Sequence, residues 1–238
     1  MSQVIGIVGL IGAGKDTVAD YLVNFHGYKR ESFANSLKDA VAQVFGWDRE
    51  MLEGRSKQSR EWREAADEWW SKRLKQEITP RWVLQYWGTE VVRKGFHDDM
   101  WVASLENRLR QSTDDIVITD CRFPNEIKAI RKAGGKVVRI KRGPEPDWFE
   151  DARSMNKGPS RNMNWALSKH NIEKLGIHAS ETAWVGTKFD VVLNNDGTLD
   201  ELYNQIELNI TKSQVQDRLD AILNPLGRFH IDSSTYGF

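Results

Sequence analysis

The chain lacks most of the features that mark secreted, membrane-bound or metal-clustered proteins. It has 238 residues and one cysteine, Cys121. A single cysteine excludes an internal disulfide framework and a cysteine-cluster metal site, and it fits a reducing cytoplasm. No apolar run is long enough to cross a membrane, and the N-terminal run lacks a basic leader. We therefore expect a cytoplasmic protein without a membrane span.

An excess of either charge is also missing. Lys and Arg together number 34, as do Asp and Glu, so no overall field draws the chain to nucleic acid or to a membrane surface. The length allows one sizeable core, or a core plus a small lid. Tryptophan, by contrast, is abundant, with ten residues.

The most informative segment is VIGIVGLIGAGKDT, residues 4–17. An apolar β-branched run leads into a glycine-rich turn, and apolar residues at helical spacing follow, as in the strand, loop and helix of a phosphate-binding P-loop. In such a loop the backbone N–H groups and the helix N-terminus face phosphate oxygens, and a lysine adds a full positive charge. The loop residues expected to bind nucleotide are Gly9, Gly12, Ala13, Gly14, Lys15, Asp16 and Thr17.

Asp16 departs from this motif, because Ser or Thr usually follows the lysine. The alternative interpretation of the segment is a glycine-rich turn with an incidental lysine. The strand-like run before it and the helical pattern after it favour the P-loop.

The remaining patterns predict an α/β fold in which helices separate five strands of a parallel sheet. A capping box is expected at Ser36 and Asp39, an N-cap at Thr79 before Pro80, and a helix start at Thr198. The expected strands are residues 3–8, 28–33, 115–119, 136–140 and 189–193.

Gly88 lies inside a predicted helix, where glycine costs about 1 kcal/mol relative to alanine. Two explanations remain open at this stage: close approach of a ligand or of backbone, or a simple kink.

A second candidate phosphate element is the apolar strand that ends in Asp120, followed by Arg122. In P-loop folds such an aspartate lies beside the loop and orients Mg²⁺ or its waters. The alternatives are a strand-end cap for Asp120 and, for Arg122, a salt bridge to Asp120 or Glu126.

Phosphoryl transfer to a small acceptor also needs cations that neutralise two phosphate groups brought close together. Each candidate is individually more typical of a solvated surface, although Arg81 and Gln85 share one helix face. Several tryptophans, Trp69 and Trp165 among them, are candidates to stack on a base, with core packing as the alternative. The candidate cations are Lys38, Arg81, Arg93, Arg122, Arg142, Arg153 and Arg161. The Asn-Lys-x-Asp motif of GTPases is missing from the sequence.

Together these motifs resemble the deoxynucleoside monophosphate kinases of tailed bacteriophages, from about residue 4 to residue 210. Six blocks carry the resemblance: residues 9–17, 32–39, 84–90 (LQYWGTE), 119–126 (TDCRFPNE), 178–181 (HASE) and 194–199 (NNDGTL). Asp16 is a trait of that family, so the departure supports the resemblance.

The resemblance implies transfer of the γ-phosphoryl group of ATP to a deoxynucleoside monophosphate, with Mg²⁺, in the cytoplasm of the host cell if the gene is a phage's. It implies a P-loop kinase domain over 1–210, with a helical acceptor-binding region at 46–112 and a lid with connections at 143–188. Residues 211–238 would be a peripheral tail. A homodimer is a further expectation, and stable binding to nucleic acid or membranes is not expected.

The resemblance, read with the motifs, also predicts a role for each site residue. Lys15 and the loop amides would bridge the phosphates, Asp16 and Asp120 would position Mg²⁺, and Arg122, Arg153 and Arg161 would cover the transferring group. The residues expected to bind the acceptor are Lys38, Arg81, Gln85, Gly88, Thr89, Arg93, Trp69 and Trp165.

Three other functions are compatible with the P-loop. They are a kinase acting on a hydroxylated base within DNA, a nucleotide-binding module without catalysis, and a kinase of the dephospho-coenzyme A type. The neutral charge disfavours the first, the acceptor-side arginines the second, and the block at 84–90 the third.

Overall fold

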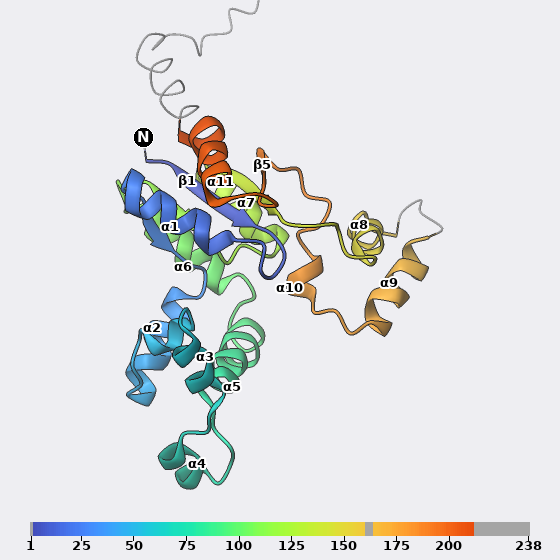
Figure 1. Ribbon diagram of the computed structural model, residues 1–238. Helices are drawn as coiled ribbons and strands as arrows, with labels where there is room; N and C mark the ends of the chain where they lie inside the picture. Colours follow the sequence, from blue (N-terminus) through green and yellow to red (C-terminus); the bar gives the residue numbers. More distant parts are fainter. Residues whose placement is uncertain (1, 160–163, 212–238) are drawn as a thin grey trace, which may run out of the picture.

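A five-stranded sheet forms the centre of the protein, seen in a computed structural model that describes residues 2–159 and 164–211 (Figure 1). The strand order is β2-β3-β1-β4-β5, and each neighbouring pair is parallel. The strands are β1 (Val4–Val8), β2 (Lys29–Glu31), β3 (Ile116–Ile118), β4 (Lys136–Lys141) and β5 (Val191–Asn194). The α/β fold with a five-stranded parallel sheet is confirmed, and each expected strand lies where the sequence placed it.

Strand β1 occupies the middle of the sheet, with Val4 opposite Ile116 of β3 and Val8 opposite Arg139 of β4. All five of its residues are buried because helices cover both faces of the sheet. Since the strands are parallel, their carboxyl ends meet at one edge. The loop that follows β1 therefore lies beside the segments that follow β3 and β4.

Helices and short helical turns connect the strands. The α-helices are α1 (Lys15–His26), α2 (Asn35–Phe45), α3 (Lys57–Glu64), α4 (Glu68–Leu74), α5 (Pro80–Tyr86), α6 (Met100–Leu109), α7 (Pro124–Lys132), α8 (Phe149–Asn156), α9 (Trp165–Lys174), α10 (Ala179–Thr182) and α11 (Leu199–Ile206). A 3₁₀ turn, η1 (Met51–Glu53), and two π-helical segments, η2 (Trp87–Lys94) and η3 (Glu207–Thr211), complete the order.

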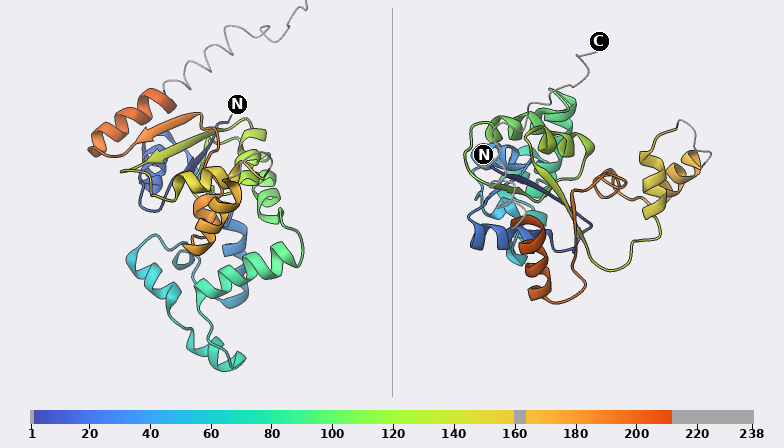
Figure 2. Two further views of the ribbon diagram at one scale, coloured as in Figure 1. Left: turned by 90° about the vertical axis from the view of Figure 1, so that its right-hand side faces the viewer. Right: turned by 90° about the horizontal axis from the view of Figure 1, so that it is seen from above.

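The two faces of the sheet have separate cores because side chains alternate along a strand. Ile5 and Ile7 of β1 pack with α1 and α11, whereas Val4 and Val8 pack with α6, α7 and residues of α8 and α9. Figure 2 shows these helices on either side of the strands. This layering holds the loop after β1 between two rigid cores.

The helices between β2 and β3 form a third core of their own, which we call the helical region. Leu37, Val41, Leu52, Ile78 and Val83 are buried in it. Five tryptophans pack in or against the same core, which explains much of the tryptophan content: Trp47, Trp62, Trp70, Trp87 and Trp101. In Figure 1 this region extends away from the sheet and ends in α4.

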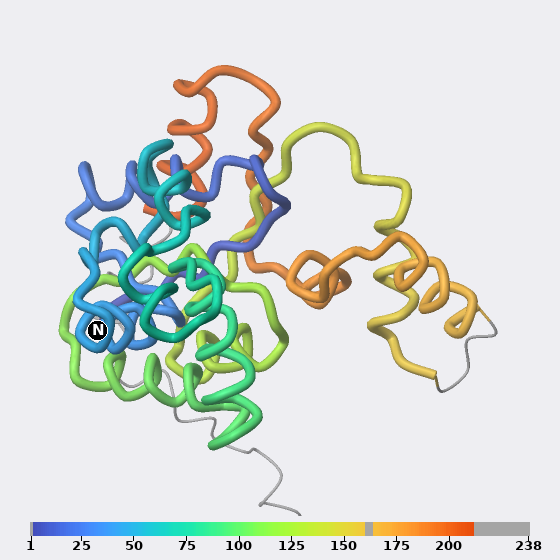
Figure 3. Tube along the Cα trace, turned by 90° about the horizontal axis from the view of Figure 1, so that it is seen from below, coloured from blue at the N-terminus to red at the C-terminus, as the bar shows by residue number. Residues whose placement is uncertain are grey.

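Helices α8 and α9 stand out from the body on one side, and α10 leads back toward the sheet (Figure 3). Ser168 and Asn171 of α9 both donate hydrogen bonds to Asp151 of α8, at 2.8 and 2.9 Å, which holds the two helices together. We call residues 143–188 the lid segment; its description as a lid remains a prediction.

Two of the three predicted helix starts are confirmed. Thr79 accepts a hydrogen bond from the backbone N–H of Trp82, and Thr198 forms a capping box with Glu201. The capping box at Ser36 is wrong, because α2 has Ala34 as its N-cap and no side-chain cap. The Ser36 hydroxyl instead lies 2.7 Å from that of Ser104 on α6.

Gly88 is explained by close approach of a side chain. A Cβ at Gly88 would lie 2.9 Å from Cδ2 of Leu37, and its carbonyl accepts a hydrogen bond from the Trp101 indole. Neither a ligand nor a plain kink is needed. Gly88 lets η2 pack closely on α2, and that contact ties the two elements into one unit.

No helix within residues 2–159 and 164–211 is long and apolar enough to cross a membrane. The predicted tail beyond 211 and the predicted lid residue Arg161 lie outside the described residues.

Candidate phosphate-binding site

The loop between β1 and α1 has the backbone shape of a phosphate cradle. Gly9, Gly12 and Gly14 all adopt positive φ angles, of 155°, 76° and 102°. A Cβ at Gly9 would lie 2.6 Å from the carbonyl oxygen of Ile140, and one at Gly14 would lie 2.4 Å from the side-chain amide of Asn195. Gly9 therefore needs glycine for space as well as for conformation, whereas at Gly14 the positive φ angle is the stronger requirement because the Asn195 side chain can move.

Lys15 lies over this loop, and within residues 2–159 and 164–211 its ammonium bonds to the loop backbone alone. The ammonium donates hydrogen bonds to the carbonyls of Gly9 at 2.8 Å and Leu10 at 2.9 Å. Burial lowers the pKa of Lys15, and the nearby Arg122 lowers it further, while Glu181 and Asp16 act in the opposite direction. The ammonium thus lies near one cationic side chain, Arg122, and two anionic ones, Glu181 and Asp16.

A pocket of about 390 Å³ opens on the loop, and its volume is in the range of small-ligand sites. Its walls are Gly12, Gly14, Lys15, Asp16, Thr17, Arg142, Asn195, Gly197 and Leu199. Asn195 donates to the Ala13 carbonyl at 2.9 Å, so the turn after β5 is attached directly to the loop. Arg142 and the turn at 195–197 thereby join the predicted loop residues in one site.

Asp16 points toward β2. Its carboxylate forms an ion pair with Arg30 at 2.8 Å, and Arg30 also pairs with Asp20 at 2.8 Å. The Asp16 side chain is 74 % exposed, so the pair is accessible to solvent and is weakly held. Its predicted role toward a metal stays a prediction.

Asp120 is bound to the segment that follows β2. It accepts hydrogen bonds from the Ser32 hydroxyl at 2.6 Å and from the backbone N–H groups of Phe33 and Ala34 at 3.1 and 3.2 Å. These contacts join two of the sequence blocks, 32–39 and 119–126, at the carboxyl edge of the sheet. Their charge-assisted character keeps the Asp120 carboxylate in place.

Arg122 contacts the block at 178–181. Its guanidinium donates to the Ser180 hydroxyl at 3.3 Å, and it lies close enough to Lys15 to affect the pKa of that lysine. The salt bridge to Glu126 considered from sequence does not form; the backbone N–H of Arg122 bonds to Glu126 at 2.7 Å. The guanidinium is left partly exposed on the side of the loop.

Glu126 is a buried carboxylate behind this segment. It accepts the N–H groups of Arg122 and Phe123 at 2.7 and 3.0 Å, and Arg93 lies 3.7 Å from its other oxygen. Burial raises the pKa of Glu126 to about 7, with a contribution from Asp120, although the hydrogen bonds and Arg93 oppose the shift. Arg93 also lies over the Phe123 ring, with its guanidinium carbon 5.3 Å from the centroid.

The predicted acceptor residues in the helical region are engaged in ion pairs. Lys38 bonds to Glu53 at 2.8 Å, and both side chains are almost buried. Arg81 bonds to Glu64 at 2.7 Å and is half exposed, one helical turn from the exposed Gln85. A ligand that recruits either cation must therefore compete with a carboxylate.

Arg63 is a further cation of this region that the sequence did not single out. Its guanidinium lies where a Cβ of Gly54 would stand, and its Nε has no hydrogen-bond partner among the described residues. Burial and the neighbouring Arg81 lower the pKa of Arg63. The packing of Arg63 on a glycine has no periodicity or motif, so only the fold reveals it.

The other predicted residues are dispersed. Trp69 is 63 % exposed on α4, at the end of the helical region away from the sheet (Figure 1), so it does not lie beside the loop. Thr89 is exposed on η2. Trp165 belongs to the lid segment and donates to the Met155 carbonyl at 3.0 Å. Arg153 lines a different pocket from the one on the loop.

No cluster of three or more His, Cys, Asp or Glu side chains suited to a metal ion occurs in the described part of the chain. The pocket wall contributes two oxygen donors, the Asp16 carboxylate and the Thr17 hydroxyl. The Glu181 carboxylate is close enough to affect Lys15, and Asp120 lies on the segment that carries Arg122. An ion that is bound chiefly through phosphate oxygens and water needs no more than one or two protein carboxylates.

Comparison with known proteins returns kinases. No family model matches the sequence. A protein of Acanthamoeba polyphaga mimivirus, provisionally named a deoxynucleotide monophosphate kinase, is 29 % identical over 217 residues, covering 85 % of this chain and 93 % of that protein. The deoxynucleoside-5′-monophosphate kinase of Escherichia phage T5 is 28 % identical over 182 residues, covering 56 % of this chain and 73 % of that protein.

Among solved structures, the dephospho-CoA kinase of Campylobacter jejuni aligns with a TM-score of 0.46 and 14 % identity, over 91 % of this chain and all of that one. The shikimate kinase of Aquifex aeolicus aligns with a TM-score of 0.40 and 13 % identity, over 90 % of this chain and 99 % of that one. The sequence comparisons confirm what the six motif blocks predict: the chain resembles the deoxynucleoside monophosphate kinases of viruses and phages.

Proposed function

We propose that this protein transfers the γ-phosphoryl group of ATP to a deoxynucleoside monophosphate, giving the diphosphate and ADP. The observation that carries the proposal is the position of Lys15, whose ammonium lies over a glycine loop on backbone carbonyls, with Arg122 close by. The two viral relatives, named for this activity, support the choice of acceptor.

The residues present fit the triphosphate of ATP. A Cβ at Gly9 would lie 2.6 Å from a backbone carbonyl oxygen, and Gly14 has a φ of 102°, so both glycines are needed to keep the loop closed around a phosphate. The N-terminus of the twelve-residue helix α1 lies directly after the loop and adds its partial positive charge. Arg142 in the pocket wall supplies a further cation.

Asp16 and Asp120 would hold Mg²⁺ through their carboxylate oxygens or through water, with the Thr17 hydroxyl beside the phosphates. The ion, when bound, would neutralise charge on the β- and γ-phosphates. Asp16 would have to exchange its exposed pair with Arg30 for this role.

No general base is required, because the attacking oxygen of the acceptor phosphate is already anionic. That oxygen forms the new bond to the γ-phosphorus as the bond from this phosphorus to the β–γ bridging oxygen breaks, and ADP leaves with the electron pair. Lys15 and Arg122 would balance the charge on the transferring group, and catalysis would consist of positioning and electrostatic stabilisation.

The acceptor would bind between the loop and the helical region. Arg93 is linked to the Arg122 segment through the buried Glu126, which contacts both. Lys38, Arg81 and Gln85 would contribute from α2 and α5, and Gly88 and Thr89 from η2. Arg153 of the lid segment would approach the phosphates only after movement of α8. Because ATP and deoxynucleotides are cytoplasmic metabolites, the proposal places the protein in the cytoplasm.

The proposal is tested by ADP release, measured with ATP alone and with each deoxy- and ribonucleoside monophosphate in turn. Stimulation by one or more deoxynucleoside monophosphates is the expected result. Equal ADP release with and without every acceptor would contradict it. Stimulation only by DNA that contains a hydroxylated base would favour the base-kinase alternative.

A further inference from the structure

A second pocket, of about 530 Å³, lies between the lid segment and the sheet and shares no lining residue with the pocket on the loop. Its walls include Arg139 of β4, Phe149 and Arg153 of α8, and Phe189 before β5. We call it the lid pocket. The proposed function uses one of its lining residues, Arg153, toward the phosphates of the loop but gives the pocket itself no role.

Arg139 is the most unusual of these residues. It lies on β4, next to the central strand β1, and is nine-tenths buried. Its Nε nevertheless has no hydrogen-bond partner in the described structure. One guanidinium nitrogen, Nη2, donates to Glu145 at 2.6 Å. A buried guanidinium donor without an acceptor is costly. Aromatic rings around it shield Nε from solvent, so an anion would reach it only after a rearrangement of these side chains.

Aromatic rings surround the same guanidinium. Its central carbon lies 4.9 Å from the ring centroid of Phe149, 5.3 Å from Trp184 and 5.7 Å from Phe189. These rings fix the plane of Arg139 through cation–π contacts. Phe149 and Phe189 also line the pocket. The Phe149 ring is almost completely buried, so the partly buried ring of Phe189 is the aromatic wall that a ligand can reach.

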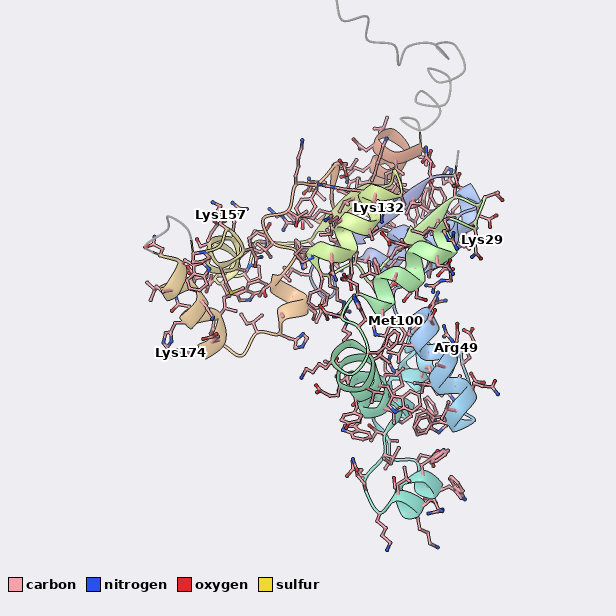
Figure 4. The ribbon with its side chains drawn as sticks, turned by 180° about the vertical axis from the view of Figure 1, so that it is seen from behind. Lys29, Arg49, Met100, Lys132, Lys157 and Lys174 are labelled. Atoms are coloured by element: carbon pink, nitrogen blue, oxygen red, sulfur yellow. The ribbon has the colours of Figure 1, made fainter. Side chains whose placement is uncertain are left out.

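The residues that line the pocket are cationic or neutral, although Glu145, which lies outside the lining, pairs with Arg139. Arg139, Arg153 and Lys157 all line the pocket, and none of its lining residues is Asp or Glu. Arg153 pairs with Glu150 at 3.2 Å, but both side chains are largely exposed, so this pair is weak. Lys157 caps α8 at the rim of the pocket, and Figure 4 shows it on the opposite part of the lid segment from Lys174.

The pocket floor is held in place by its own hydrogen bonds. The Asn156 side chain donates to the carbonyls of Thr182 at 2.7 Å and Val185 at 2.8 Å, which ties α8 to the segment after α10. The turn at Gly186 has a φ of 86°, a value that glycine adopts without strain. These hydrogen bonds fix the elements that carry the cations and rings of the pocket.

We propose that the lid pocket is a second nucleotide-binding site, separate from the loop. A nucleoside phosphate matches it in three respects: negative charge for Arg153, for Lys157 and, after exchange of its pair with Glu145, for Arg139; a flat base for Phe189; and a size suited to the volume. A lone inorganic anion would leave the aromatic wall unused. The proposal does not depend on the acceptor of the kinase reaction.

The test is photo-crosslinking of the full chain with 8-azido-ATP, followed by identification of the labelled peptides. We expect label in peptides that contain Phe149 or Phe189 as well as in loop peptides, and we expect the lid-pocket label to persist in Lys15→Ala. Label confined to loop peptides, or lid label that disappears in Lys15→Ala, would overturn the proposal.

Variants of the lining sharpen the test. Lys157→Gln and Arg139→Lys should each lower the affinity for the lid-pocket label about tenfold, the usual effect of one lost charge-assisted contact. Lys157 is exposed, so its variant keeps the fold even if the change at buried Arg139 does not. Lys174→Gln, an exposed change on α9 outside the pocket, is the matched control and should leave labelling unchanged. Equal labelling of Lys157→Gln and the control would contradict the proposal.

Competition experiments distinguish binding of a whole nucleotide from binding of its nucleoside or its phosphate alone. ATP should displace the lid-pocket label at a concentration at which adenosine and inorganic phosphate do not. Equal displacement by adenosine would reduce the site to an apolar crevice, and equal displacement by phosphate would reduce it to an anion site; either result would overturn the nucleotide assignment. ADP release is measured independently, so the kinase proposal stands or falls separately.

Discussion

Lys15 and Lys38 are both lysines near the N-terminus of a helix, but their surroundings differ. The Lys15 ammonium bonds to two loop carbonyls, whereas the Lys38 ammonium forms an almost buried ion pair with Glu53. Arg49 binds the same carboxylate from the other side. A lysine held by neutral carbonyls keeps its full charge for a phosphate, but one held by a carboxylate already has its counter-ion.

The same contrast separates the loop from the helical region. Around the loop, Asn195 and the glycines shape a pocket that Lys15 and Arg142 line. In the helical region, Lys38 and Arg81 face carboxylates. We infer that the nucleotide side is assembled in this structure, while acceptor binding would require exchange of ion pairs.

The largest expected effect is that of Lys15→Ala, which should lower kcat about a thousandfold or more, because a charge aimed at the transferring phosphate is lost. The measurement is ADP release at saturating ATP and acceptor. The control is Lys29→Ala, which removes an exposed lysine of the edge strand β2 that pairs with Asp114 (Figure 4). This variant should leave turnover unchanged. Near-normal activity of Lys15→Ala would remove the basis of the proposed function.

Glu53→Gln should destabilise the protein by about 3 kcal/mol at neutral pH, because it leaves Lys38 and Arg49 without their shared carboxylate. Burial alone would raise the pKa of Glu53, but hydrogen bonds from Lys38 and Arg49 outweigh it and lower the pKa to about 2.

The stabilisation from Glu53 is therefore fully present above about pH 4.5 and is lost as the pH falls toward 2. Urea unfolding of the wild type and the variant from pH 7 to pH 3 measures this difference. If the difference in unfolding free energy between wild type and variant stays constant with pH, the carboxylate charge does not contribute to the stabilisation.

Glu126→Gln should show the opposite dependence on pH. The pKa of Glu126 is raised to about 7, so the folded state binds a proton more tightly than the unfolded state. Wild-type stability from this group is full below about pH 4.5 and falls as the pH rises through 7.

The Gln variant, which stays neutral, should gain about 3 kcal/mol relative to wild type between pH 4.5 and pH 8. Denaturant midpoints across that range test this, with Glu106→Gln, a partly exposed carboxylate on α6, as control. An equal gain in unfolding free energy for Glu106→Gln would show that the change in net charge, and not the burial of Glu126, is the cause.

Arg81→Ala should have the smallest effect, about a tenfold rise in the KM for the monophosphate with the KM for ATP unchanged. Its ion pair with Glu64 must open for the acceptor, so Glu64→Gln should keep or lower the acceptor KM. Initial rates with each substrate varied in turn give both constants. An equal rise in both KM values would assign Arg81 a structural role.

The fold was largely predictable from sequence because β-branched runs, glycines and Thr-Pro or Asp-Gly signals are local. The glycine loop was equally visible, since its residues are contiguous. Side-chain partners were not. Ser36 looked like an N-cap but contacts Ser104, sixty-eight residues away, and Asp16 pairs with Arg30 across two elements.

Long-range contacts also explain what the sequence missed in the site. The Arg63 guanidinium packs on Gly54, the Asn195 side chain donates to the Ala13 carbonyl, and the Ser32 hydroxyl donates to Asp120. The blocks at 32–39 and 194–199 contained Ser32 and Asn195, but only the sheet order brings each to its partner. Packing, not periodicity, determines which polar side chains meet.

The most direct test of the kinase assignment follows the phosphoryl group itself. ATP labelled with ³²P at the γ-position is incubated with the protein and each deoxynucleoside monophosphate, and the products are separated. The proposal predicts label in a deoxynucleoside diphosphate with wild type and its loss in Lys15→Ala. Label that remains in ATP, or appears only in inorganic phosphate, would contradict it.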